Sequence, residues 1–294
     1  MEKAPRDGGF ALVTVLWGLL ILGAIAAVML STERISGRLA ATGLARAQAE
    51  ALFDAAVNRA VLGLLDRRAD HRWRVDGTPR DAVFKDRAVS VTIQDEYGKI
   101  DLNMASRELL RSMFVVAGQT ADSADALTDA VLDWREQGDL KRLNGAKAAD
   151  YLAAGYDYVP RGGPFQTIEE LQLVMGMTPR LFHEIEPIVT VYSQRQKVND
   201  QTASRAALLS LPGMDVAKVE AIMATRAAGL ADAAAAGPIV RGIIDPSVLL
   251  SGWPFTIRVE VPIGTEHWIR ETTIRLTGDE GRPYWTLAVR GRTE

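Results

Sequence analysis

The sequence predicts an α+β protein: a long N-terminal helix, transmembrane and then amphipathic, packs on an antiparallel sheet, and a large all-α domain interrupts that sheet. Three observations lead to this prediction. Residues 10–30 carry no charge, and apolar residues continue at helical spacing beyond them. Residues 89–94 alternate between apolar and polar side chains, and the last part of the chain repeats this alternation. The long region between these strands contains mainly helical patterns.

Residues 10–30 are numerous enough to form a membrane-spanning helix. At about 1.5 Å per residue, such a helix covers roughly the 30 Å hydrocarbon core of a bilayer. We therefore expect a polar leader at 1–9 and a transmembrane helix at 10–31. Lys3 and Arg6 before the run, with Ala24-Ile25-Ala26 inside it, also fit an ordinary cleavable secretory signal, and an uncleaved anchor is a third possibility.

The junction between Gly9 and Phe10 lies where the polar leader meets the apolar run. The stretch 8–17, GGFALVTVLW, resembles the prepilin signal of type IV pilins and type II secretion pseudopilins. The resemblance implies that a prepilin peptidase cuts after Gly9, so that Phe10 becomes the mature N-terminus. It also implies a single-pass protein of the bacterial inner membrane with its bulk in the periplasm. Basic residues lie on both sides of the helix, so charge alone leaves the orientation open and only the resemblance indicates it.

Beyond the anchor, apolar residues at helical spacing extend the predicted helix to about Leu65. We assign residues 32–98 to this helix and the first strands of the sheet. Val89, Val91 and Ile93 form one side of a half-buried strand. Further strands are expected at 255–261, 268–276 and 284–289, forming an antiparallel meander within 251–294.

Residues 99–250 are expected to form the inserted helical domain. Helices are predicted at 105–117, 123–136, 167–175 and 203–211. The segment 102–110 is echoed by 198–209, and in both an Asn or small polar residue precedes an amphipathic helix, as a cap requires. The echo predicts two related subdomains. One head with an insertion is the simplest topology, because the late strands need the early strand and the long helix to bury their apolar face.

Several motifs in the chain point to one family. They are DEYGKIDLN at 95–103, LDWR at 132–135, TIEEL at 167–171, Val198-Asn199, and Leu211-Pro212-Gly213. Together they resemble general secretion pathway protein K, the large minor pseudopilin of type II secretion. The resemblance implies a scaffold protein at the tip of the periplasmic pseudopilus. Its implied partners are the I and J components, the major pseudopilin, the prepilin peptidase and the inner membrane.

The same resemblance suggests a role for the first residues of the mature chain. Most pilins carry Glu at the fifth mature position, whereas this chain has Thr14, and the K family lacks that Glu. We expect Thr14 and the nearby Trp17 to act in the membrane and in assembly. A subunit with no neighbour above it has no amine to neutralise there, which favours a tip position.

An acidic cluster in the inserted region could bind calcium, which takes six to eight oxygen ligands. The candidate ligands are Asp133, Glu136 and Asp139, with Asp150 nearby. Members of the resembled family can bind calcium in this domain through Asp-Trp-Arg-Asp and Gly-Ala-Glu, but this chain has Glu136 in the first motif and Lys147 in the second. A solvated acidic surface is therefore the favoured alternative.

Two other functional classes compete with a scaffold role. Leu211-Pro212-Gly213-Met214 looks like a helix-hairpin-helix turn, so a membrane-tethered DNA-binding protein is the alternative function. The acids around it match its cations and the net charge of the chain is −3, so we expect no nucleic-acid partner. We expect no enzyme, because 183–186 lacks the second His of a zinc helix. The chain has no cysteine and thus no disulfide.

Overall fold

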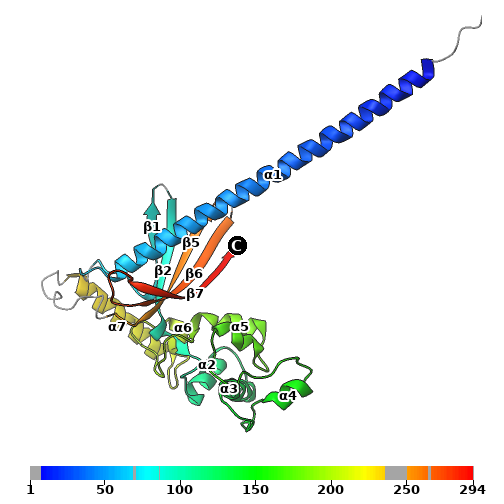
Figure 1. Cartoon of the computed structure of the whole chain (residues 1–294). Helices are drawn as coiled ribbons and strands as arrows, with labels where there is room; N and C mark the ends of the chain where they lie inside the picture. Colours follow the sequence, from blue (N-terminus) through cyan, green and yellow to red (C-terminus); the bar gives the residue numbers. More distant parts are fainter. Residues whose placement is uncertain (1–7, 69–70, 86, 236–249, 264–265, 294) are drawn as a thin grey trace, which may run out of the picture. The chain divides into compact units, whose positions relative to one another are not determined.

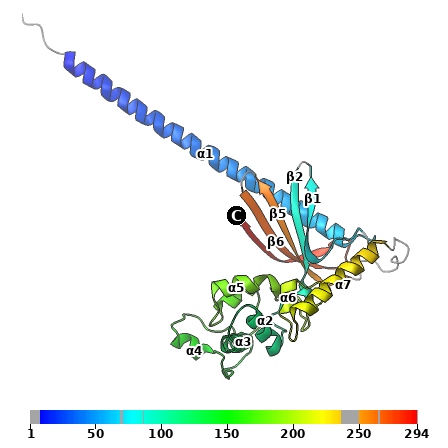
Figure 2. The same cartoon turned by 180° about the vertical axis from the view of Figure 1, so that it is seen from behind.

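The computed structural model describes residues 8–68, 71–85, 87–235, 250–263 and 266–293, and Figures 1 and 2 show it from two sides. The chain divides into two compact units, Met1–Leu52 and Phe53–Glu294. Most of the predicted leader 1–9 lies outside the described residues. Helix α1 runs from Gly8 to Leu64 and contributes to both units, so its end lies one residue before the predicted one.

In the first unit, the described side chains of residues 12–27 are all exposed. Leu12 is 73% exposed, Leu16 56% and Trp17 63%. In the part of the chain that the structure describes, we find no helix both long enough and apolar enough to span a membrane. The predicted transmembrane segment 10–31 is therefore not confirmed and stays a prediction.

The second unit contains an antiparallel sheet, in which the described strands follow the order β1-β2-β5-β6-β7. Four of these strands match the predicted ones. The first, β1, was missed because its sequence, DGTPRDAVF, contains Gly77 and Pro79 and shows little apolar alternation. The bounds are β1 Asp76–Phe84, β2 Arg87–Asp95, β5 Pro254–Ile263, β6 Glu266–Leu276 and β7 Tyr284–Thr293.

The last turns of α1 belong to the second unit and carry the predicted amphipathic stripe. The buried side chains recur three or four residues apart, as on one face of a helix. Arg270 of β6 reaches this helix, because its guanidinium carbon lies 4.5 Å from the Phe53 ring and its Nη1 lies 3.4 Å from Asp54 Oδ1. The buried residues of the stripe are Phe53, Ala56, Val57, Ala60, Val61 and Leu64.

The helical insertion leaves the sheet at the end of β2 and returns at the start of β5, and Asp95 and Phe255 are register partners. Figure 1 colours this insertion from green to yellow. Its described elements surround one apolar core that includes Phe114, Trp134 and Tyr151. The mixed helix and antiparallel sheet confirm the α+β class. The elements are η1 Glu96–Gly98, β3 Ile100–Asp101, α2 Arg107–Val116, α3 Ala121–Arg135, α4 Ala148–Ala153, η2 Ile168–Leu173, α5 Pro179–Ile185, η3 Glu186–Ile188, β4 Val189–Thr190, α6 Arg205–Leu209 and α7 Val216–Ala235.

Two helix pairs inside the insertion, α2–α3 and α6–α7, use the same hydrogen bonds. Ser106 caps α2 and Ser204 caps α6, each accepting a backbone N–H three residues later. In the first pair, Arg135 in the last turn of α3 donates to the carbonyl of Ala105, just before α2. In the second pair Arg226 of α7 donates to the carbonyl of the matching Ala203. The capping residues in the predicted echo are thus the serines.

Candidate functional sites

The motif 95–103 forms the joint between the sheet and the insertion. The carboxylate of Asp95 is buried and accepts the Tyr97 N–H at 2.9 Å and the Thr202 hydroxyl at 2.8 Å. Burial raises the pKa of Asp95, and these hydrogen bonds act in the opposite direction. The joint therefore carries an aspartate that is costly to ionise.

Glu96 ties three elements together at this joint. Its side chain is 2% exposed, and it accepts hydrogen bonds from Thr256 of β5 at 2.7 Å and from Thr190 of β4. The ammonium of Lys99 lies 2.6 Å from the same carboxylate. A buried charge is stable only when paired and hydrogen-bonded, and Glu96 meets both conditions. No sequence pattern beyond the motif itself indicates this role for Glu96.

Aromatic contacts close the other side of the joint. The ring of Tyr97 meets that of Trp253 edge-on, with centroids 4.9 Å apart. The guanidinium carbon of Arg195 lies 4.2 Å from the Tyr97 centroid. Such pairs add stability beyond their buried area. The joint thus connects residues from the beginning and the end of the insertion with the turn that leads into β5.

The three predicted calcium ligands are not assembled around a vacant position. Arg142 donates from Nη1 to Asp133 Oδ1 at 2.7 Å and from Nη2 to Glu136, while its backbone N–H donates to Asp133 Oδ2 at 3.1 Å. The hydrogen bond from Arg142 lowers the pKa of Glu136. Asp139 is exposed. Among the described residues, no group of three His, Cys, Asp or Glu side chains could hold a metal ion.

A second internal cation occupies the same region. Lys147 is 7% exposed, and its Nζ donates to the carbonyls of Asp133 and Glu136 at 2.8 Å each. The ammonium therefore caps the end of α3, where the last carbonyls of a helix lack partners. Calcium binding by Asp133 and Glu136 would have to displace Arg142. The contacts of Arg142 and Lys147 were not predicted from the sequence.

The predicted processing and assembly residues lie in the first unit, apart in sequence from the acidic cluster. Gly9 and Phe10 fall in the first turn of α1, and the Phe10 side chain lies outside the described part. Thr14 and Trp17 are both exposed. The cleavage of the Gly9–Phe10 bond and the roles of Thr14 and Trp17 stay predictions.

In the helix-hairpin-helix turn, the cationic side chains contact oxygens of the turn and its helices. Gly213 has a positive φ of 74°, and Lys218 donates from Nζ to the Gly213 carbonyl at 2.7 Å. Arg205 lies 2.7 Å from Glu220. A phosphate contact requires available cations near the turn. Both of these cations already contact oxygen atoms of the protein.

Comparisons with known proteins agree on one family. A family model for type II secretion system protein K matches residues 92–194, which include the motif 95–103 and the insertion as far as β4. A type II secretion system protein K of Dickeya chrysanthemi is 29% identical over 84 residues, or 29% of this chain and 23% of the relative. The aligned segment thus spans about a quarter of that relative's length.

A solved structure shares the fold over a longer range. It is a chain from the crystal structure of the GspK–GspI–GspJ complex of the type 2 secretion system of enterotoxigenic Escherichia coli. The TM-score is 0.57 at 18% identity, covering 83% of this chain and 96% of the other. The motif at 95–103 lies inside the matched domain, so residues 92–194 are similar to type II secretion system protein K, and the longer likeness to the solved structure is one of fold.

Proposed function

We propose that this protein is a minor pseudopilin that forms the tip of the periplasmic pseudopilus and helps start its assembly for the export of folded proteins. The observation that carries the proposal is the protein K match over 92–194, because this segment contains Asp95, Glu96 and Tyr97, from which the insertion leaves the sheet. The proposed role is structural and assigns no catalytic residue.

We also propose that residues 10–31 anchor the protein in the inner membrane after a prepilin peptidase has removed residues 1–9. The exposed apolar side chains of residues 12–27, among them Leu12 and Trp17, support this anchor, because exposed apolar surface of this extent favours a lipid or protein environment. Periplasmic residues would then comprise the helix and first strands at 32–98, the insertion at 99–250 and the final strands at 251–294.

The size and position of the insertion support a place at the tip. It stands between β2 and β5, which are neighbours in the sheet. A subunit in the middle of a filament must accept a copy above it, and so large an insertion is expected to obstruct that position. The proposed neighbours are the I and J components and, below them, the major pseudopilin.

Coexpression tests the assembly role. The full chain and the I and J components from the same genome are produced together, extracted in mild detergent and measured by light scattering after size exclusion. We expect one complex that contains all three proteins. Periodic labelling of this chain along pseudopilus shafts, or no association with the I and J proteins, would contradict the tip role.

Sequencing of the mature N-terminus tests the anchor. We expect the chain to begin at Phe10 in cells with prepilin peptidase, and Gly9→Leu to leave a larger precursor. A mature chain that begins at Ala27 would establish the secretory-signal alternative instead.

A further inference from the structure

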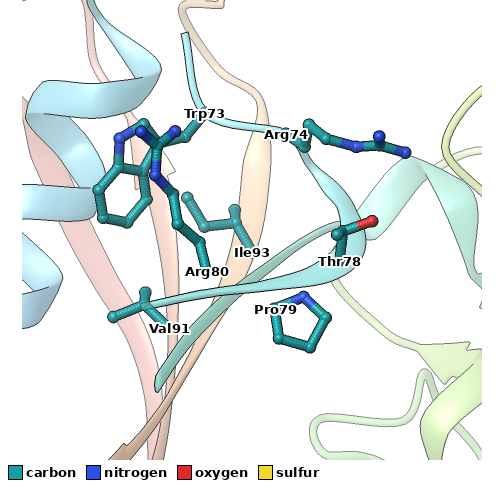
Figure 3. A pocket seen from close by; sticks show the side chains of 7 residues that line it. All are labelled: Trp73, Arg74, Thr78, Pro79, Arg80, Val91 and Ile93. Atoms are coloured by element: carbon teal, nitrogen blue, oxygen red, sulfur yellow. The ribbon is translucent and has the colours of Figure 1, made fainter. Parts of the chain in front are cut away.

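A pocket in the second unit is lined by strands β1 and β2 and by the segment that leads into β1. Its volume is about 260 Å³, and Figure 3 shows its lining. Trp73 forms one wall and is 6% exposed, while Pro79 and Arg80 of β1 and Val91 and Ile93 of the neighbouring β2 form the rest of the lining shown. The indole packs so tightly on α1 that a Cβ on Gly63 would lie 2.4 Å from Trp73 Cδ1. The apolar wall is therefore held in a fixed position.

Two arginines share the Trp73 ring. The guanidinium carbon of Arg80 lies 5.0 Å from the ring centroid, and that of Arg59 lies 5.7 Å from it. Within the described residues, neither arginine forms an ion pair with an acidic side chain, whereas Arg74 on the same pocket donates from Nε to Asp76 at 3.1 Å. A guanidinium that stacks on a ring keeps its in-plane N–H donors for a carboxylate. Two like charges beside one ring favour an anion near them.

The surrounding sequence has the opposite charge to the whole protein. Residues 59–87 contain eight Lys and Arg against five Asp, whereas the chain carries a net charge of −3. A local surplus of positive charge steers acidic partners toward this surface. Arg59 and Arg80 are thus placed where an acidic partner would arrive.

We propose that this pocket binds an acidic segment of a partner protein, with a carboxylate on Arg80, which lines the pocket, with Arg59 on the same ring adding positive charge beside it, and with a neighbouring apolar side chain against Trp73. The volume of about 260 Å³ lies below the roughly 300–1,000 Å³ of small-molecule sites and suits a side chain. Trp and Arg are also the residues that most often dominate the energy of protein interfaces. The inference stands on these contacts and does not require the role proposed above.

Side chains, more than strand addition, carry this recognition. Strand β1 is an edge of the described sheet, but it contains Pro79, which has no N–H to offer an added strand. Recognition by added strands depends on backbone hydrogen bonds. The partner segment is therefore selected by its carboxylates and by the apolar residue beside them.

Peptide binding to the full chain in nonionic detergent tests the proposal. The probe is a fluorescein-labelled peptide with one leucine flanked on both sides by glutamates, and the readout is fluorescence polarisation. We expect saturable binding that Arg59→Gln and Arg80→Gln each weaken about tenfold, the size of a hot-spot contact. The matched control is Arg87→Gln, an exposed arginine in the same basic segment, which should bind as the unchanged protein does. Circular dichroism melts establish that all variants are folded.

Two further probes separate this site from general attraction between charges. A peptide with lysines in place of the glutamates should not bind, and one with serine in place of leucine should bind at least several-fold more weakly. Equal binding of the leucine and serine peptides, or equal loss in Arg87→Gln, would overturn the proposal. Tighter binding of phosphatidylglycerol vesicles or a DNA duplex through the same two arginines would also overturn it.

Discussion

Gly98 and Thr202 approach so closely that a Cβ on Gly98 would lie 2.8 Å from the Thr202 carbonyl oxygen. Gly98 closes the 3-10 turn that follows β2, and Thr202 precedes the cap of α6. The two segments are more than 100 positions apart, as the hydrogen bond from Thr202 to Asp95 illustrates. This contact is where the start and the end of the insertion meet.

Replacing Gly98 by alanine should destabilise the protein by about 1–3 kcal/mol, because the new methyl group must push backbone atoms apart. The matched control is Gly163→Ala, where the nearest atom to a Cβ is Arg161 Cγ at 3.9 Å and the change should be nearly neutral. Urea unfolding followed by circular dichroism measures the difference. Equal stability of the two variants would show that the joint can relax.

Replacing Glu96 by alanine should cost about 3–5 kcal/mol, as expected when a buried ion pair loses one partner. The hydroxyls of Thr190 and Thr256 and the ammonium of Lys99 would all lose their shared acceptor. Hydrogen exchange should increase first at β4 and the start of β5. Glu169→Ala provides the control, because its ion pair with Arg290 is 41% exposed on the Glu side and should contribute little.

Calcium should not raise the melting temperature of the full chain, because Arg142 and Lys147 already hold the oxygens of Asp133 and Glu136. Lys147→Met should lower stability by about 1–3 kcal/mol by leaving buried carbonyls without a donor. Differential scanning fluorimetry with calcium and with EDTA measures both effects. A calcium shift that disappears in Asp133→Ala with Asp139→Ala would restore the predicted metal site.

The pH dependence of stability should have opposite signs at two carboxylates. The pKa of Asp95 is raised by burial, so its stabilising contribution is present at acidic pH and is lost as pH rises through that raised pKa. The pKa of Glu136 is lowered by Arg142, so its contribution is present above the ordinary glutamate pKa and is lost as pH falls through the lowered value. Relative to the unchanged protein, Asp95→Asn and Glu136→Gln should therefore change the slope of unfolding free energy against pH in opposite directions. If both substitutions changed the slope in the same direction, this assignment would be refuted.

The strands and helices that could be predicted have simple periodic signals. Val89, Val91 and Ile93 alternate with polar residues along β2, and the sequence placed this strand correctly. The edge strand β1 has no such pattern, because a strand at the exposed edge of a sheet need not bury every second side chain. The segment expected as a helix at 167–175 is the shorter 3-10 helix η2.

The sites were harder to predict than the fold, for a physical reason. The acidic cluster can be seen in the sequence. Its cationic partners, Arg142 and Lys147, come later in the chain, and only the fold brings their side-chain nitrogens to oxygens of Asp133 and Glu136. The pairing of Glu96 with Thr256 joins residues 160 positions apart. Likewise, no local pattern places Arg59 of α1 and Arg80 of β1 on one indole ring.

The register that pairs Asp95 with Phe255 also sets the order in which the molecule can form. During synthesis, β2 leaves the ribosome long before its neighbour β5 exists, so the sheet cannot be completed until the whole insertion has been made. The insertion, with its own apolar core, can fold first, since domains generally fold as units during synthesis. Until β5 arrives, β2 is paired on one edge only, with β1, and a nascent chain in this state presents an unpaired strand edge to its surroundings.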